Sequence, residues 1–243
     1  MRAIGIVQAR MGSSRLYGKI LHPLRQIPLL RVLATRLASA EVDEWWLATT
    51  TRSEDELTAS WGQALGWGVY RGSSEDVLSR FTAIIRMREP DYVVRITSDD
   101  PFTDSRMVNE TLRQARAMPA GHSLLTPGTR NTLPTGYGAS VVAAERLLQT
   151  EGEIPEGHSH HRAHVTSWLI QRQEHAEFAA PRDWPARPGW RWTVDTEEDA
   201  SMAAAAFDLF GEEWPEITYP EMVRLLDAHP EIVSLNEGIP QKR

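Results

Sequence analysis

The feature that most constrains this chain is its beginning, where a short apolar run leads directly into a basic loop that contains glycine and serine. The run is AIGIV (residues 3–7) and the loop reads QARMGSSRLYGK (residues 8–19). Glycine lets the backbone come close to a ligand, and free backbone N–H groups bind phosphate oxygens together with Arg and Lys. A buried strand followed by such a loop predicts a nucleotide triphosphate site.

The spacing within the loop excludes the two familiar phosphate-binding motifs. Five residues separate Gly12 from Gly18, and Ile20 follows Lys19, so the Walker A pattern G-x-x-x-x-G-K-[ST] does not fit. The dinucleotide pattern G-x-G-x-x-G fails because Ser14 stands where its second glycine belongs. A solvated basic turn is the alternative, but three cations and four small residues in one loop favour phosphate binding.

Apolar segments with strand and helix character alternate along the first half of the chain, which predicts parallel βαβ units. We expect strands over residues 3–7, 45–50, 68–70, 92–96, 139–142 and 190–194. We expect helices over residues 28–40, 74–87, 104–118, 143–149, 161–172 and 220–228, one that Ser53 caps, and one from residue 197. Residues 127–138 are rich in turn formers, and residues 151–159 read as an acidic loop. In parallel sheets the ligand lies beyond the carboxyl ends of the strands, where the loop also falls.

Composition narrows the class of protein further. A chain of 243 residues, 41% of them hydrophobic, suits a single α/β domain over residues 1–243. The net charge of −7 argues against general nucleic-acid binding. The chain has no cysteine, which excludes disulfides, a thiol nucleophile and a Cys-based zinc site. No apolar stretch is long enough to span a membrane, and we expect a cytoplasmic protein.

Four segments carry a resemblance to a known family. They are residues 6–16 with Gly18 and Lys19, residues 70–81 (YRGSSEDVLSRF), residues 94–102 (VRITSDDPF) and residues 191–199 (RWTVDTEED). Together they closely resemble the SpsF-like cytidylyltransferases, relatives of the CMP-sialic acid and CMP-Kdo synthetases. The resemblance implies a three-layer, Rossmann-like nucleotidyltransferase fold of the GT-A-like kind, with a mostly parallel central sheet.

Two aspartates follow expected strands and are the best candidates for metal ligands. Mg²⁺ typically takes one or two protein carboxylates together with phosphate oxygens and water, and we expect Asp99 and Asp195 to hold Mg²⁺, or Mn²⁺ in its place. In the related synthetases the matching aspartates hold the metal. A turn or helix-capping role is the alternative for Asp99, although Asp100 and Asp104 suit that role better, and a cap of the helix from residue 197 is the alternative for Asp195. Asp100 replaces a small neutral residue of the family, and either a metal contact or an acceptor-site charge is open for it.

The loop supplies the expected phosphate ligands. We expect Arg15 and Lys19 to contact the β- and γ-phosphates of the nucleotide and to stabilise departing pyrophosphate, with Arg10 nearer the α-phosphate. Backbone donors are expected from Gly12 and Ser13. Ala9 belongs to the same nucleotide-binding loop. Tyr17 stands where the family usually has proline, which would stiffen the loop.

The resemblance also implies nucleotide-pocket contacts by Arg71, Gly72 and Asp76. A helix cap at the serines that precede Asp76, followed by acids in the first turn, is compatible with that role. Thr49, at the end of a strand, either borders the nucleotide or is a solvated strand end.

A histidine-rich patch occupies residues 158–164. His160 and His164 have the i, i+4 spacing of one helical face, but neither an HExxH pattern nor a cysteine accompanies them, so zinc is a minor alternative. Arg162 and His164 match a family motif, Arg-Glu-His, in which Ala163 replaces the acid. The resemblance makes both residues plausible contacts to an anionic acceptor.

These observations predict a Mg²⁺-dependent cytidylyltransferase that transfers CMP from CTP to a sugar acid, phosphate or phosphonate and releases pyrophosphate. The alternatives are a GT-A glycosyltransferase that uses a nucleotide sugar, and an inactive nucleotide-binding regulatory protein. The expected partners are CTP and a small anionic acceptor, without nucleic acid or membrane. A homodimer is compatible with the nine tryptophans, which leave room for an interface.

Overall fold

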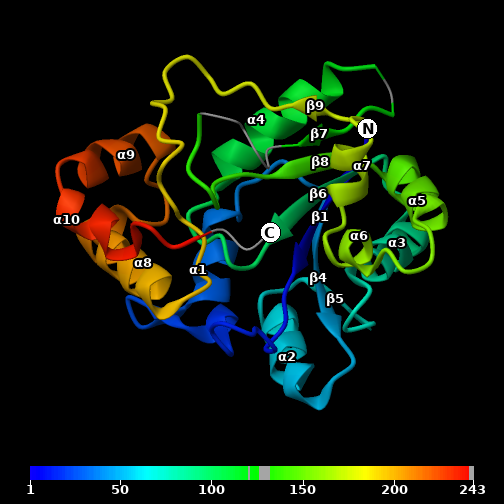
Figure 1. Cartoon of the computed structure of the whole chain (residues 1–243), viewed down its shortest axis with the longest axis horizontal. Coiled ribbons are helices and arrows are strands. Elements are labelled where there is room, and N and C mark those ends of the chain that lie inside the picture. The colour runs from blue at the N-terminus through cyan, green and yellow to red at the C-terminus, as the bar shows by residue number, and fades with distance from the viewer. Residues whose placement is uncertain (120, 126–131, 241–243) are drawn as a thin grey trace.

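The computed structural model describes residues 1–119, 121–125 and 132–240, and within them a seven-stranded sheet forms the centre of the molecule (Figure 1). The strand order is β5-β4-β1-β6-β8-β7-β9. The strands are β1 (Ala3–Gln8), β4 (Glu44–Thr50), β5 (Gly68–Gly72), β6 (Tyr92–Thr97), β7 (Leu124–Leu125), β8 (Ser140–Ala143) and β9 (Ala176–Glu177). Only β8 runs against the other six described strands. The sheet is therefore mostly parallel, as expected.

Helices cover both faces of the sheet and make the three layers of the expected fold class (Figure 1). Alternate residues of β1 face opposite cores, since Ala3 and Val7 belong to one cluster and Ile4 and Ile6 to the other. One face is covered by α1 (Leu29–Arg36), α2 (Glu56–Ala64), α4 (Ser105–Arg116), α8 (Glu197–Leu209) and α9 (Tyr219–Asp227). The other face is covered by α3 (Val77–Arg88), α5 (Ala144–Glu153) and α7 (Ser167–Gln171), and α6 (Ser159–Ala163) lies against α3.

Several expectations for the second half of the chain are wrong. Residues 190–194 form no strand of the sheet; they are an extended segment with one isolated bridge between Thr135 and Arg191. The expected helix over residues 161–172 is broken into α6 and α7, because Val165 has a positive φ of 23°. The acidic loop begins later than expected, since α5 continues to Glu153. Part of the turn-rich stretch 127–138 lies outside the described residues.

Elements that the sequence did not predict are short. They are the sheet strands β7 and β9, the short strands β2 (Pro23–Leu24) and β3 (Ile27–Pro28), the helix α10 (Pro230–Val233), and the 3₁₀ turns η1 (Lys19–Leu21), η2 (Ser53–Asp55), η3 (Gly211–Glu213) and η4 (Ser234–Asn236). Ser53 does not cap α2; it opens η2 instead. None of the helices in the described ranges is long and apolar enough to cross a membrane.

Polar caps set the starts of the helices that follow the sheet. The Asp76 carboxylate accepts a hydrogen bond from the backbone N–H of Ser79 at 2.9 Å and begins α3. Asp104 accepts one from Met107 at 2.9 Å and begins α4, the capping role that the sequence favoured for it. Because β1, β4, β5 and β6 are parallel, the loops after them leave the sheet at one edge, where the candidate site lies.

Candidate active site

The loop after β1 is closed by its own backbone. The N–H groups of Ser13 and Gly18 both donate to the carbonyl of Met11, at 2.8 and 2.9 Å. Gly18 has a φ of 67°, in the left-handed region that favours glycine, and Lys19 then opens the 3₁₀ turn η1. These bonds close the loop without the family's proline at position 17. They also engage the N–H of Ser13, which the sequence predicted as a phosphate donor.

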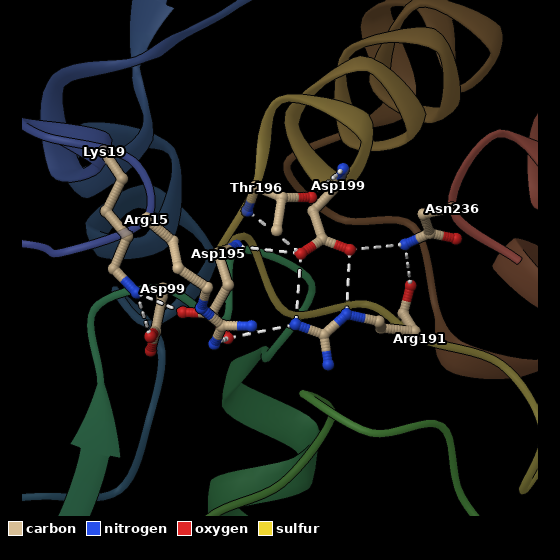
Figure 2. A network of polar contacts seen from close by, with 8 residues as sticks. All are labelled: Arg15, Lys19, Asp99, Arg191, Asp195, Thr196, Asp199 and Asn236. Carbon is tan, nitrogen blue, oxygen red and sulfur yellow. Dashed lines mark hydrogen bonds and ion pairs between the residues drawn. The ribbon is translucent and has the colours of Figure 1, made fainter. Parts of the chain in front are cut away.

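Two cations of the loop meet two aspartates from distant segments (Figure 2). The Lys19 ammonium lies 2.5 Å from Asp99 Oδ2 and 2.7 Å from Asp195 Oδ1. The Arg15 guanidinium lies 2.6 Å from Asp195 Oδ2. A backbone hydrogen bond of 2.8 Å, from Val194 N–H to the Asp99 carbonyl, ties the two acidic segments together. The structure therefore gathers four residues that the sequence nominated from three separate motifs.

The close approach of these charges changes how the groups ionise. Burial disfavours the charged form of Lys19, but Asp99 and Asp195 outweigh it and raise the pKa of the ammonium. Burial also opposes ionisation of Asp195, yet Lys19 foremost, followed by Arg15, holds the pKa of its carboxyl below the usual value. At Asp100, burial first and the charge of Asp99 second raise the pKa to about 7.

The two aspartates fit a magnesium ion that is shared with phosphate. Carboxylate oxygens are the hard ligands that Mg²⁺ prefers, and both carboxylates already converge on one positive charge, the ammonium of Lys19. Within the described residues no group of three or more His, Cys, Asp or Glu side chains could hold a metal alone. Asp100 is directed elsewhere, since it accepts hydrogen bonds from the hydroxyls of Thr97 and Thr193. These residues therefore suit a metal–nucleotide complex rather than a metal bound by protein alone.

The start of the loop is anchored to β4 and to the turn after it. The N–H of Ala9 donates to the carbonyl of Ala48 at 3.2 Å, and the N–H of Met11 donates to Asp55 Oδ1 at 2.7 Å. Asp55 is fully buried and also accepts hydrogen bonds from the hydroxyls of Thr50 and Thr58. Sequence reasoning missed this role, because Asp55 lies in the segment that was assigned to the start of the helix capped by Ser53.

Arg10 and Gly12 lie toward the turns that follow β4 and β5. The Arg10 guanidinium donates to the carbonyl of Ser74 at 3.0 Å, just before α3. Gly12 packs so close to Glu54 that a Cβ atom added there would lie 2.9 Å from Glu54 Oε1. The loop thus bridges β1 and the edge of the sheet at β4 and β5.

The residues nominated for the nucleotide pocket make mainly structural contacts. Arg71 donates to the carbonyls of Thr50 and Arg52, both at 3.0 Å, and pairs with Glu56 at 2.6 Å. A Cβ atom added to Gly72 would lie 2.9 Å from Cγ of the buried Arg80. Thr49 is also fully buried, so it is not a solvated strand end. Arg71 clamps the turn after β4, and Gly72 allows α3 to pack closely.

The residues nominated for the acceptor side lie over the start of α3. Arg162 pairs with Asp76 at 2.9 Å and donates to the carbonyl of Glu151 at 3.1 Å, so it joins α6 to α3 and to α5. His164 is exposed, and its ring centroid lies 4.4 Å from that of His160. Arg162 therefore ties α6 to its neighbouring helices, and His164 is exposed at the surface beside them.

A buried network of Arg191, Asp199 and Asn236 lies next to Asp195 and was not predicted from the sequence (Figure 2). Arg191 Nε and Nη2 donate to the two oxygens of Asp199 at 2.8 and 3.0 Å, and Asn236 Nδ2 donates to Asp199 Oδ1 at 2.9 Å. Asp199 is 1% exposed. The signal for Asp199 was its place three residues after Thr196, in the capping box that begins α8.

This fold and this meeting of phosphate loop and carboxylates define a nucleotidyltransferase. A family model described as cytidylyltransferase matches residues 4–138, and the chain belongs to that family. It is 29% identical to the spore coat polysaccharide biosynthesis protein SpsF of Bacillus subtilis, over 96% of this chain and 97% of that protein. It is 31% identical to the 3-deoxy-manno-octulosonate cytidylyltransferase of Escherichia coli, over 49% of this chain and 48% of that one. The predicted resemblance is therefore confirmed.

Solved structures agree on the fold. A cytidylyltransferase from Leptospira borgpetersenii superposes with a TM-score of 0.89 at 23% identity, covering 99% of this chain and 100% of that one. A CMP:2-keto-3-deoxy-manno-octonic acid synthetase, solved with CTP, superposes with a TM-score of 0.65 at 20% identity, covering 86% of this chain and 99% of that one.

Proposed function

We propose that this cytidylyltransferase uses CTP and Mg²⁺ and transfers CMP to a small anionic acceptor, with release of pyrophosphate. The observation that carries the proposal is the position of Lys19, whose ammonium bridges Asp99 and Asp195. The loop supplies positive charge that can bind a triphosphate. Asp99, after β6, and Asp195, after the extended segment 190–194, supply carboxylates that can bind a cation at the same place.

The residues at this point have complementary roles in the proposed reaction. Asp99 and Asp195 would hold a magnesium ion, which neutralises phosphate charge and polarises the α-phosphate. Lys19 and Arg15 would then exchange their carboxylate partners for phosphate oxygens and stabilise the negative charge that develops on the leaving pyrophosphate. The anchoring of the loop by Asp55 keeps these cations in position, so that little reorganisation is needed during the transfer.

The acceptor that we favour carries an oxygen that is already ionised. Of the described carboxylates at this point, Asp99 and Asp195 pair with cations and Asp100 is bonded to hydroxyl groups, so none is placed as a general base. An ionised phosphate, phosphonate or carboxylate oxygen needs no base, whereas a hydroxyl group would benefit from one. The exposed His164 is our candidate for a contact to the acceptor, in agreement with the anionic acceptor expected from the sequence.

Nucleotide binding is tested first by thermal shift, because this assay needs no acceptor. The protein is compared with CTP, UTP, GTP and ATP, each with and without Mg²⁺. A ligand at a hundredfold its dissociation constant stabilises the folded state by about 2.7 kcal/mol. We expect this stabilisation with CTP and Mg²⁺ together, and we expect it to be weaker in Asp99→Ala. The control Asp208→Asn removes a carboxylate at an exposed position of α8 and should retain the stabilisation.

Turnover is then measured as pyrophosphate release from CTP with sugar acids, sugar phosphates and phosphonates as acceptors. Release with CTP, Mg²⁺ and an acceptor supports the proposal. A protein that binds no triphosphate, or that releases pyrophosphate from another triphosphate in preference to CTP, contradicts it. Turnover on a sugar acid through its hydroxyl, and on no acceptor with an ionised nucleophile, would refute our choice of acceptor.

A further inference from the structure

The guanidinium of Arg191 is shared between two carboxylates. Its Nη2 lies 3.0 Å from Asp199 Oδ2 and 3.0 Å from Asp195 Oδ2, and its Nε lies 2.8 Å from Asp199 Oδ1 (Figure 2). Arg191 therefore binds Asp199 through two nitrogens but reaches Asp195 through only one. A two-point pair between a guanidinium and a carboxylate is the stronger and more directional of the two arrangements.

Hydrogen bonds from several directions fix the Asp199 carboxylate, and with it the guanidinium of Arg191. Its two oxygens accept five N–H groups, which come from Arg191 twice, from the backbone of Asp195 and Thr196, and from the Asn236 amide. Asn236 also donates to the carbonyl of Arg191 at 2.9 Å, so the side chain and the backbone of Arg191 are both fixed. Asp199 and Asn236 are nearly inaccessible to solvent.

Three cations lie beside Asp195, namely Arg15, Lys19 and Arg191, and nucleotide binding is expected to move only the first two. Arg15 and Lys19 belong to the phosphate loop, and in the proposed reaction the triphosphate draws both away. Arg191 belongs to the buried network and remains. It lies at the same oxygen, Asp195 Oδ2, that Arg15 contacts in the free protein. If Arg191 turned fully to Asp195, it would compete with a metal ion for that carboxylate.

We propose that Asp199 is a positioning residue that holds Arg191 back from Asp195 and so leaves the Asp195 carboxylate available to the metal–nucleotide complex. The inference rests on the proposed function, and it explains why Arg191, Asp199 and Asn236 form a buried network beside Asp195. It predicts that neutralising Asp199 weakens metal binding, and that removing Arg191 as well restores it.

The test is a titration of Mn²⁺ in the presence of saturating CTP, followed by the electron paramagnetic resonance signal of free Mn²⁺. The proteins are wild type, Asp199→Asn, Arg191→Gln, the double variant, and Asp208→Asn as a matched control on the same helix. CTP affinity without metal and the far-UV circular dichroism spectrum are recorded for each. Asp199→Asn should weaken Mn²⁺ binding by about tenfold, in the range found when residues that orient metal ligands are replaced. CTP affinity without metal should stay unchanged.

The double variant separates positioning from a purely structural role. Recovery of most of the lost Mn²⁺ affinity supports the proposal, because a structural defect would be as large or larger in the double variant. A folded double variant that binds Mn²⁺ no better than Asp199→Asn would overturn it. Arg191→Gln alone should bind Mn²⁺ at least as tightly as wild type, and weaker binding overturns the proposal even if Asp199→Asn does not fold. If wild type with CTP binds no Mn²⁺, the proposed function itself fails, and this inference fails with it.

Discussion

Replacing Lys19 by methionine should raise the affinity of the free protein for a divalent metal and lower turnover at the same time. In the free protein the ammonium lies 2.5 and 2.7 Å from the two carboxylates, and its side chain is 12% exposed, so a metal ion must displace it. Coulomb attraction at these distances is about 6 kcal/mol for each pair at an effective dielectric constant of about 20. Desolvation cancels most of it. The net value typical of a charged hydrogen bond, about 1.5–3 kcal/mol, corresponds to about 10–100-fold in metal affinity.

The assay is a Mn²⁺ titration without nucleotide, together with pyrophosphate release from CTP under saturating Mg²⁺. We expect Mn²⁺ to bind about 10–100-fold more tightly to Lys19→Met than to wild type. Turnover should fall by about 10²–10³-fold, because a cation that stabilises the leaving group is lost. Arg31→Met, on the exposed side of α1, removes the same charge away from the site and should change neither quantity.

The two measurements must move in opposite directions for the reasoning to hold. A folded Lys19→Met protein that binds Mn²⁺ no better than wild type would show that the ammonium does not occupy the metal position. Retention of wild-type turnover would show that Lys19 does not assist the leaving group.

Three further perturbations test other parts of the site. The raised pKa of Asp100, about 7, means that its stabilising contribution is complete below its unfolded pKa of about 4 and is lost as pH rises through about 7. Asp100→Asn should therefore raise the melting temperature by a few degrees at about pH 8 and leave it nearly unchanged at about pH 4, in metal-free buffer. Asp55→Ala removes the anchor of Met11 and should lower the free energy of unfolding in urea by about 2–4 kcal/mol; a loss within error of wild type would show that the loop is held otherwise. Gly136 has a φ of 90°, and a Cβ atom there would lie 2.3 Å from the backbone nitrogen of Thr193, so Gly136→Ala should cost about 3 kcal/mol and reduce turnover. Full stability of that variant in the same urea titration would contradict the close approach.

The sequence predicted the first half of the fold well, because its strands and helices carry their own local patterns. β4, β5 and β6 appear within two residues of where their apolar segments placed them, and α4 begins at the predicted cap, Asp104. The second half was predicted less well. Residues 190–194 look like a strand, yet within the described ranges their bridge is the isolated one between Arg191 and Thr135, because the sheet beside β6 is completed by the antiparallel β8.

The contacts of single residues were likewise predicted well in some cases and not in others. Arg15, Lys19, Asp99 and Asp195 were nominated from motifs, because basic glycine-containing loops and carboxylates after apolar segments have recognisable local chemistry, and the structure brings these four side chains together. Arg71 and Asp76 were nominated by the family resemblance alone, and the structure engages Arg71 with the turn after β4 and Asp76 with Arg162. The type of a charged residue indicates which groups it can bind. Which of several such groups it contacts depends on segments far away in the chain, so the sequence motif alone does not predict the partner.

By itself, then, the sequence determined the class of fold and the family, and it nominated the charged residues of the candidate site, because short local patterns carry all three. Tertiary structure alone decided that Lys19 lies between Asp99 and Asp195, and that Asp199 and Asn236 hold Arg191 beside Asp195. These contacts join residues between 4 and 176 positions apart. Their geometry follows from how the end of β6, the extended segment 190–194 and α8 pack together, and no local pattern contains that information.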